Sequence, residues 1–311
     1  MEDTITAIST PAGAGGIGIV RMSGPQALEI ARRIFVPQRP VREFQSHRLY
    51  LGHLLDPSTR AFIDEVLVSF MKGPSSYTRE DVVEINSHSG PLLLSKILQI
   101  TIQAGARQAK PGEFTFRAFM NGRIDLTQAE AVVDLIHSRS EKGLALAAGQ
   151  LRGGFGDELE SLRKKGIEIL AVLEAAIDFP EEVTTILEDA ETIQRMGEEL
   201  LDPLGKMIDA QKQQRFWVEG VATVIVGRVN AGKSSLLNRL LDEERALVTP
   251  VPGTTRDVIE STLYVEGIPL RLMDTAGFRK GRGKVESLGI RMTEPAENSA
   301  HILKISFRPA H

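Results

Sequence analysis

The sequence has no cysteine among its 311 residues, which excludes a disulfide-stapled scaffold, a zinc site with thiolate ligands and a thiol nucleophile. It also has no excess of basic residues, because 37 Lys and Arg stand against 41 Asp and Glu, a net charge of −4. No global positive field therefore draws in nucleic acid, and any RNA contact must be local or shared with a partner.

Long hydrophobic runs are also missing. No segment reaches the roughly 18 to 20 unbroken apolar residues that a membrane helix needs. The first residues, Met1-Glu2-Asp3, are acidic where a signal peptide is basic. We therefore expect a cytoplasmic, unprocessed chain that does not enter a membrane.

What is present is the composition of a soluble globular protein, with 42% hydrophobic and 25% charged residues. The length favours two or three domains. The hydrophobic periodicity of the sequence changes twice. This pattern predicts an α+β domain over 1–118, an α-helical domain over 119–217 and an α/β domain over 218–311.

In the first region, short β-rich runs alternate with Gly and Pro. Strands are expected at 4–8, 17–22, 64–71 and 81–86, where apolar and polar residues alternate or β-branched residues gather. Helical spacing is expected over 25–35 and 91–104. The second of these helices would place Leu92, Leu93, Leu94, Ile97 and Ile100 along its apolar side.

The middle region has helical periodicity. Thr127 and Glu130 fit a capping box that would begin one helix. Apolar residues then recur every three or four positions between Leu159 and Leu173, and Pro180 should end that helix. A further amphipathic stretch covers 181–214. These helices are too few to close a large core alone, which suggests a missing segment or a partner subunit.

A phosphate-binding motif opens the third region. Residues 227–234, GRVNAGKS, match G-x-x-x-x-G-K-[ST] in full, between an apolar strand at 221–226 and a helical stretch at 235–241. The backbone N–H groups of such a loop converge on phosphate oxygens. Lys233 would reach the β- and γ-phosphates, and the Ser234 hydroxyl would bind Mg²⁺. The competing interpretation, a glycine-rich turn with a chance match, does not account for this strand–loop–helix context.

Two later segments support a nucleotide switch. Asp274-Thr275-Ala276-Gly277 follows a second apolar strand at 269–273, and Pro252-Gly253-Thr254-Thr255 lies between this segment and the P-loop. An Asp at a strand end can hold Mg²⁺ through water, and a threonine hydroxyl can complete the metal shell. The three segments in this order indicate a switch nucleotidase.

Several segments then resemble one family. GRVNAGKSSLLNRL, PGTTRD and DTAGFR resemble the Era/TrmE branch of small GTPases. Residues 10–24, 109–115, 118–126 and 174–180 resemble the MnmE (TrmE) family of tRNA modification GTPases. This resemblance implies a folate-binding N-terminal domain that forms a homodimer, a central helical domain and a P-loop GTPase domain inserted into it. It also implies a flavoprotein partner, MnmG, and the addition of a carboxymethylaminomethyl group to the wobble uridine of tRNA.

The resemblance assigns a folate site to Arg21, Glu84 and Arg123. The two arginines would pair with carboxylates of 5-formyl- or methylene-tetrahydrofolate, and Glu84 would accept hydrogen bonds from the pterin. Without the resemblance, each would more readily be read as a surface charge.

The resemblance also assigns GTP, Mg²⁺ and K⁺. Ser234 and Thr255 match the Mg²⁺ ligands, and Asn230, Thr249, Val251 and Thr254 match the potassium site. Lys233 and Glu286 match the catalytic positions, with Glu286 orienting the attacking water. The full nucleotide set comprises Asn230, Ala231, Gly232, Lys233, Ser234, Ser235, Thr249, Pro250, Val251, Pro252, Gly253, Thr254, Thr255, Asp274, Thr275, Ala276 and Gly277.

The end of the sequence departs from the family. No N-K-x-D guanine motif follows Gly277, and the terminal Cys-containing motif is missing. Residues 301–306 can still form the next strand, which would give about four strands in an incomplete GTPase domain. These features suggest a C-terminally truncated or frame-shifted copy. Two alternatives stay open: a folate-binding dimerisation module with a non-functional nucleotide domain, and a P-loop ATPase without guanine preference.

Overall fold

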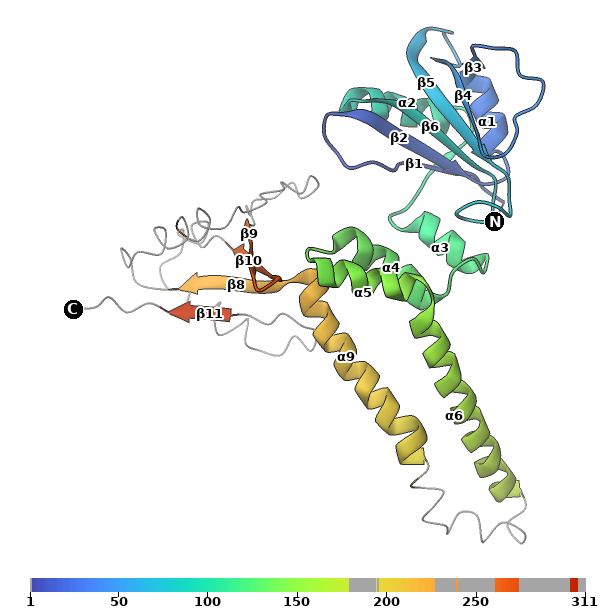
Figure 1. Cartoon of the computed structure of the whole chain (residues 1–311). Helices are drawn as coiled ribbons and strands as arrows, with labels where there is room; N and C mark the ends of the chain where they lie inside the picture. The colour runs from blue at the N-terminus through green and yellow to red at the C-terminus, as the bar shows by residue number, and fades with distance from the viewer. Residues whose placement is uncertain are drawn as a thin grey trace, which may run out of the picture. The chain divides into compact units, whose positions relative to one another are not determined.

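A computed structural model describes residues 2–178, 194, 196–226, 239, 261–273 and 303–306 (Figure 1). The described residues form two compact units, one ending at Ala129 and the other beginning at Glu130. The division falls inside helix α4 (Leu126–His137). The predicted boundary at 118 falls inside helix α3 (Glu113–Met120). The three-domain division stays a prediction.

A seven-stranded sheet forms the N-terminal unit, in the order β3-β4-β5-β6-β2-β1-β7. Neighbouring strands run antiparallel except β1 and β7, which are parallel. The strands are β1 (Ile5–Ile8), β2 (Gly15–Ser23), β3 (Phe35–Pro37), β4 (Arg48–Leu55), β5 (Phe62–Met71), β6 (Val82–Ser89) and β7 (Arg107–Gln108).

Helices α1 (Ala27–Ile34) and α2 (Pro91–Gln103) share one core with the inner face of this sheet. Alternating residues of β5, such as Val66 and Val68, point into that core. Helix α2 packs closely over β2, because a Cβ at Gly18 would lie 2.7 Å from a Leu94 methyl carbon. A side chain at position 18 would therefore require the Leu94 side chain to move.

Most predicted elements of the N-terminal region are confirmed. Strands at 4–8, 17–22, 64–71 and 81–86 match β1, β2, β5 and β6, and the two predicted helices match α1 and α2. One predicted core position was wrong. Leu92 is 85% exposed, because it lies in the first turn of α2 and faces away from the sheet, whereas Leu94, Ile97 and Ile100 are buried.

The second unit contains α5 (Glu141–Leu151), α6 (Gly154–Asp178), a π-helical turn η1 (Gly197–Leu201) and α9 (Asp202–Glu219), besides most of α4. Helix α6 is described as far as Asp178, and Pro180, which is predicted to end it, lies outside the described residues. Of the predicted amphipathic stretch 181–214, residues 181–193 lie outside the described residues, and the part from Met196 onward is helical.

The predicted capping box at Thr127 was wrong by two residues. Asp125 occupies the cap, because its Oδ1 accepts from the backbone N–H of Gln128 at 2.8 Å. The Gln128 side chain forms the reciprocal hydrogen bond, because its Oε1 accepts from the backbone N–H of Asp125 at 2.9 Å. Thr127 instead donates its hydroxyl to Asp125 at 2.7 Å. A carboxylate is a better N-cap acceptor than threonine here, and the helix begins at Leu126.

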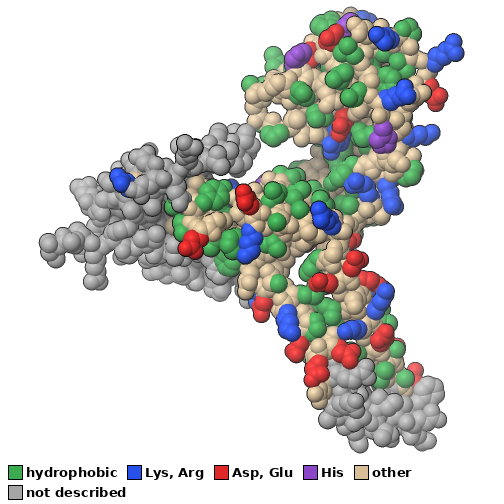
Figure 2. All heavy atoms as spheres, in the orientation of Figure 1, with side chains coloured by type: hydrophobic (Ala, Val, Ile, Leu, Met, Phe, Trp, Pro, Cys, Tyr) green, Lys and Arg blue, Asp and Glu red, His purple; other side chains and the backbone are tan. Residues whose placement is uncertain are grey.

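The apolar stripe predicted for α6 is present but largely uncovered. Leu162 is 8% exposed, whereas Ile167 is 49% and Leu170 is 53% exposed. Figure 2 shows hydrophobic side chains among charged ones on the visible surface of these helices. None of the described helices combines the length and the apolar character that crossing a bilayer requires.

A second sheet follows α9, with strand order β11-β8-β10-β9. Its strands are β8 (Val221–Val226), β9 (Ser261–Val265), β10 (Ile268–Met273) and β11 (Leu303–Ser306). Strand β8 runs parallel to both β10 and β11, and β9 forms an antiparallel hairpin with β10. The strands predicted at 221–226 and 269–273 are therefore confirmed, as is the predicted strand 301–306 over residues 303–306, because residues 301 and 302 lie outside the described residues.

Candidate ligand-binding site on the N-terminal sheet

The outer face of β2 and β6 carries a close ion pair. Arg21 and Glu84 lie directly opposite each other in the antiparallel register. The Arg21 Nη2 lies 2.7 Å and the Nε 2.8 Å from Oε1 of Glu84. Their neighbours along the strands, Val20 and Ile85, point inward to the core, so strand alternation places this pair on the face opposite α1 and α2.

Two aromatic rings lie beside Arg21 of this ion pair. The guanidinium carbon of Arg21 lies 5.8 Å from the ring centre of Tyr77 and 5.7 Å from that of Phe114. Arg123 lies against the same Tyr77, with its Cζ 5.0 Å from the ring centre. Tyr77 is therefore shared by two arginines, and its hydroxyl bonds the Thr115 hydroxyl at 3.0 Å.

The Arg21 cluster consists of Arg21, Glu84, Arg123, Tyr77 and Phe114. Its chemistry suits an aromatic anion. Two guanidinium groups and one carboxylate leave a net charge of about +1, beside two rings that are only partly buried. Guanidinium groups bind carboxylates through paired N–H donors and also stack on planar rings. A ligand with a fused ring and carboxylates would find partners of both kinds here.

The three predicted folate residues therefore lie together, although they are far apart in the sequence. The sequence did not indicate that Arg21 and Glu84 bind each other. Because they form an ion pair, any ligand that binds either side chain must share or replace that contact. The sequence reasoning did not select Tyr77 and Phe114, the two rings that lie beside Arg21. Phe114 lies in the segment 109–115 that carries the family resemblance. An aromatic residue in a motif segment of a family expected to bind a fused-ring ligand was the signal that could have indicated it.

The predicted nucleotide and metal residues lie outside the described residues. They are Asn230, Ala231, Gly232, Lys233, Ser234, Ser235, Thr249, Pro250, Val251, Pro252, Gly253, Thr254, Thr255, Asp274, Thr275, Ala276, Gly277 and Glu286. The strands that precede two of these segments are described. The P-loop sequence follows β8, Asp274 follows β10, and the two strands are parallel neighbours.

A cavity of about 660 Å³ lies within the second unit. The N-terminus of α5, the end of α9 and the β9–β10 hairpin line it, and Lys142 there lies 4.0 Å above the ring centre of Trp217. Arg139 links these elements, since its backbone N–H bonds the Val218 carbonyl at 3.3 Å and its Nη1 bonds the Thr262 hydroxyl at 3.1 Å.

Two family models match the chain: "GTP-binding protein TrmE N-terminus" over residues 4–123 and "MnmE helical domain" over residues 126–308. The chain is 48% identical over 307 residues to a tRNA modification GTPase MnmE from Syntrophobacter fumaroxidans. It is 47% identical to the protein of that name from Carboxydothermus hydrogenoformans, and 45% identical to that from Staphylococcus aureus.

Each alignment covers 97% of this chain and 65–66% of the relative. The chain thus spans just under two thirds of the length of these relatives. Because the helical-domain model alone matches more than half of the chain, and near half-identity extends over almost all of it, the chain belongs to the MnmE (TrmE) family.

Proposed function

We propose that this chain binds and hydrolyses GTP in the service of tRNA modification. The relatives that it matches over 97% of its length are named as tRNA modification GTPases, and this similarity is the observation that carries the proposal. The reaction would occur in the cytoplasm, where tRNA is available, and would add a carboxymethylaminomethyl group to the wobble uridine. A homodimer and the flavoprotein MnmG are the proposed partners.

Strand placement supports nucleotide binding. Strands β8, β10 and β11 are parallel, so their carboxyl ends share one edge of the sheet. In open α/β sheets, ligands bind at this edge. The P-loop and the Asp274 segment each begin where one of these strands ends, which brings the starts of both segments to the same edge.

In the proposed reaction, Lys233 and the P-loop amides would hold the phosphates, while Ser234 and Thr255 would bind Mg²⁺. Asn230, Thr249, Val251 and Thr254 would hold K⁺, which would supply positive charge in place of an arginine finger. Glu286 would orient the attacking water. K⁺ should therefore stimulate turnover.

We further propose that the Arg21 cluster binds tetrahydrofolate as 5-formyl or methylene derivative, the donor of the one-carbon unit. The carboxylates of the glutamate tail would pair with Arg21 and Arg123, and the pterin would lie against Tyr77 or Phe114. Supporting this are the 5.0 Å distance from Arg123 to the Tyr77 ring and the two rings beside Arg21.

GTP turnover measured in KCl and in NaCl tests the first proposal. We expect turnover in KCl to exceed that in NaCl, and Lys233→Ala to abolish it in both. The alternative is a folate-binding dimerisation module with a non-functional nucleotide domain. Folate binding without turnover in either salt would favour that alternative. Equal displacement of labelled GTP by ATP would indicate a nucleotidase without guanine preference.

Calorimetry with 5-formyltetrahydrofolate tests the second proposal. Arg123 is exposed, so Arg123→Met should weaken binding by on the order of tenfold while leaving the thermal midpoint unchanged. Arg32→Met is the matched control, because Arg32 is an exposed arginine on α1, away from the cluster. Equal loss of affinity in both variants would contradict a site at Arg123.

A further inference from the structure

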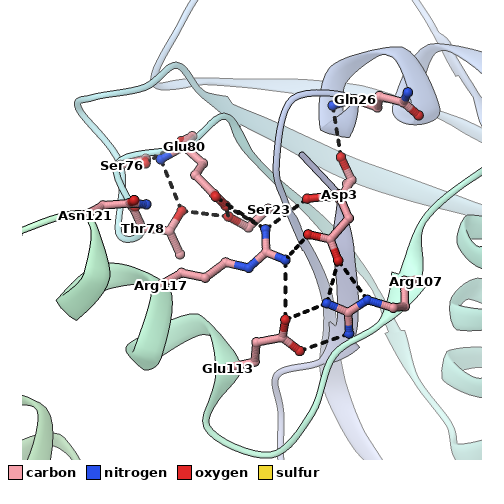
Figure 3. A network of polar contacts seen from close by, with 11 residues as sticks. Asp3, Ser23, Gln26, Ser76, Thr78, Glu80, Arg107, Glu113, Arg117 and Asn121 are labelled. Atoms are coloured by element: carbon pink, nitrogen blue, oxygen red, sulfur yellow. Dashed lines mark hydrogen bonds and ion pairs between the residues drawn. The ribbon is translucent and has the colours of Figure 1, made fainter. Parts of the chain in front are cut away.

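Arg117 on α3 is a fully buried cation, with 0% of its surface exposed. Buried arginines are rare unless they are paired. Its Nη2 lies 2.7 Å from Oδ1 of Asp3 and 3.3 Å from Oε1 of Glu113, and its Nη1 lies 3.1 Å from Oε2 of Glu80 (Figure 3). Nη1 also donates to the backbone carbonyl of Asp3 at 2.9 Å. One guanidinium thus joins the segment before β1, the loop before β6, and α3.

The network continues from Glu80 through the loop. Ser23 at the end of β2 donates to Oε2 of Glu80 at 2.7 Å, and its hydroxyl bonds that of Thr78 at 2.6 Å. The Thr78 carbonyl accepts from the side-chain amide of Asn121 at 2.6 Å. The loop is therefore fixed both to the sheet and to the end of α3, with Arg117 between these contacts (Figure 3).

The segments that Arg117 joins also supply the ring and cation partners of the Arg21 cluster. Tyr77 comes from the loop, next to Thr78. Phe114 comes from the first turn of α3, and Arg123 follows its end. The distances from Tyr77 to Arg123 and from Phe114 to Arg21 therefore depend on how α3 and the loop are seated on β2 and β6.

We propose that Arg117 is a positioning residue for the folate site, a role that rests on the proposed folate binding. Arg117 does not touch the ligand. It holds α3 and the loop 74–80 at the distance from the sheet that places Tyr77, Phe114 and Arg123 around Arg21. The planar fork of a guanidinium is required because three carboxylates approach it from different segments, and a lysine ammonium offers one compact charge instead.

Arg107 provides a matched control. It binds two of the same carboxylates, with its Nη2 2.6 Å from both Asp3 Oδ2 and Glu113 Oε1. Its side chain is 44% exposed, and neither of its two ion pairs involves Glu80. Loss of Arg107 therefore removes a guanidinium from the same network but leaves the direct link to the loop in place.

The test compares Arg117→Lys, Arg117→Met and Arg107→Met by calorimetry with 5-formyltetrahydrofolate and by amide hydrogen exchange without ligand. We expect both Arg117 variants to bind on the order of tenfold more weakly, as for other residues that orient binding groups. Exchange should rise in residues 74–80 and 113–123 but not in β6. Arg107→Met should retain affinity. Wild-type affinity and exchange in the Arg117 variants would overturn the proposal.

A second variant covers the case in which Arg117→Met does not fold. Glu80→Gln removes the carboxylate through which Arg117 reaches the loop and leaves the ion pairs of Arg117 with Asp3 and Glu113 in place. It should raise exchange in 74–80 and weaken folate binding, and unchanged values in both would overturn the positioning role. If the wild-type chain binds no folate, the proposed folate site is wrong. Amide hydrogen exchange in residues 74–80 and 113–123 then tests separately whether Arg117 holds α3 and the loop against the sheet.

Discussion

At the scale of single residues, the charges around Arg117 strongly favour one another's ionised forms. The hydrogen bond from Arg107 is the main reason that the pKa of Glu113 falls to about 2, and the backbone N–H of Lys110 adds to it. Arg107 also lowers the pKa of Asp3. Burial opposes the charge on Arg117, but Glu80 and Asp3 outweigh it and the pKa of Arg117 is raised. Glu113, Asp3 and Arg117 are therefore charged at neutral pH.

This arrangement predicts a stability that falls in acid. Because the pKa of Glu113 is lower in the folded than in the unfolded chain, its contribution is present above about pH 5 and is lost as the pH falls towards 2. One pKa unit corresponds to about 1.4 kcal/mol, so the ceiling on this contribution is about 3 kcal/mol. Glu113→Gln should lower the free energy of unfolding at pH 7 by a large part of that amount.

Urea unfolding at pH 7 and pH 3 checks the prediction, with the gap between wild type and Glu113→Gln expected to shrink at pH 3. Glu29→Gln is the control, since Glu29 and its partner Arg32 are both more than 40% exposed. Such surface pairs contribute about 0 to 1 kcal/mol. A gap for Glu113→Gln that stays constant with pH would show that its ionisation is not linked to folding.

At the scale of elements, the cap of α4 gives a direct comparison between the predicted and the observed start. Asp125→Ala removes the acceptor for the N–H of Gln128 and should cost about 1 kcal/mol of stability. Thr127→Ala removes only a hydroxyl donor and should cost less. Hydrogen exchange in the first turn, residues 126–129, should rise for the first variant alone. The reverse order of effects would restore Thr127 as the cap.

Alternation and helical spacing predicted the strands and helices that form the N-terminal core, because one face of each is buried. They failed for β4 and α3. In β4, residues 48–51 are mostly exposed, and inward alternation begins only at Gly52. In α3, the buried residues are Arg117 and Ala118, and the charge on Arg117 gives the opposite of an apolar signal.

The candidate site was predictable only in part for a related reason. Arg21, Glu84 and Arg123 were assigned to the site through the family resemblance, since each is an ordinary charge by local pattern. The network of Asp3, Glu80 and Arg117 joins residues 37 and 114 positions apart. No local signal marks such partners, because only the packed sheet, loop and helix bring them together.

At the scale of the whole molecule, the second unit depends on a close approach between helices. Ser140 caps α5 by accepting from the N–H of Gly143 at 2.9 Å, and its hydroxyl donates to the Trp217 carbonyl at 2.6 Å. A Cβ at Gly143 would lie 2.4 Å from that same carbonyl oxygen. The absence of a side chain at this position lets the start of α5 meet the end of α9, from which β8 continues.

Gly143→Ala should therefore force α5 and α9 apart and destabilise this unit by about 1 to 3 kcal/mol, as overpacking does elsewhere. Gly149→Ala in the same helix is the matched control, because a Cβ there meets nothing within 4 Å. It should stabilise the helix by about 0.8 to 1 kcal/mol, since alanine is the better helix former. Trp217 is the only tryptophan and lies at this junction, so its fluorescence reports both effects during urea unfolding. If both variants moved the midpoint in the same direction, the close contact between α5 and α9 would not limit the stability of this unit.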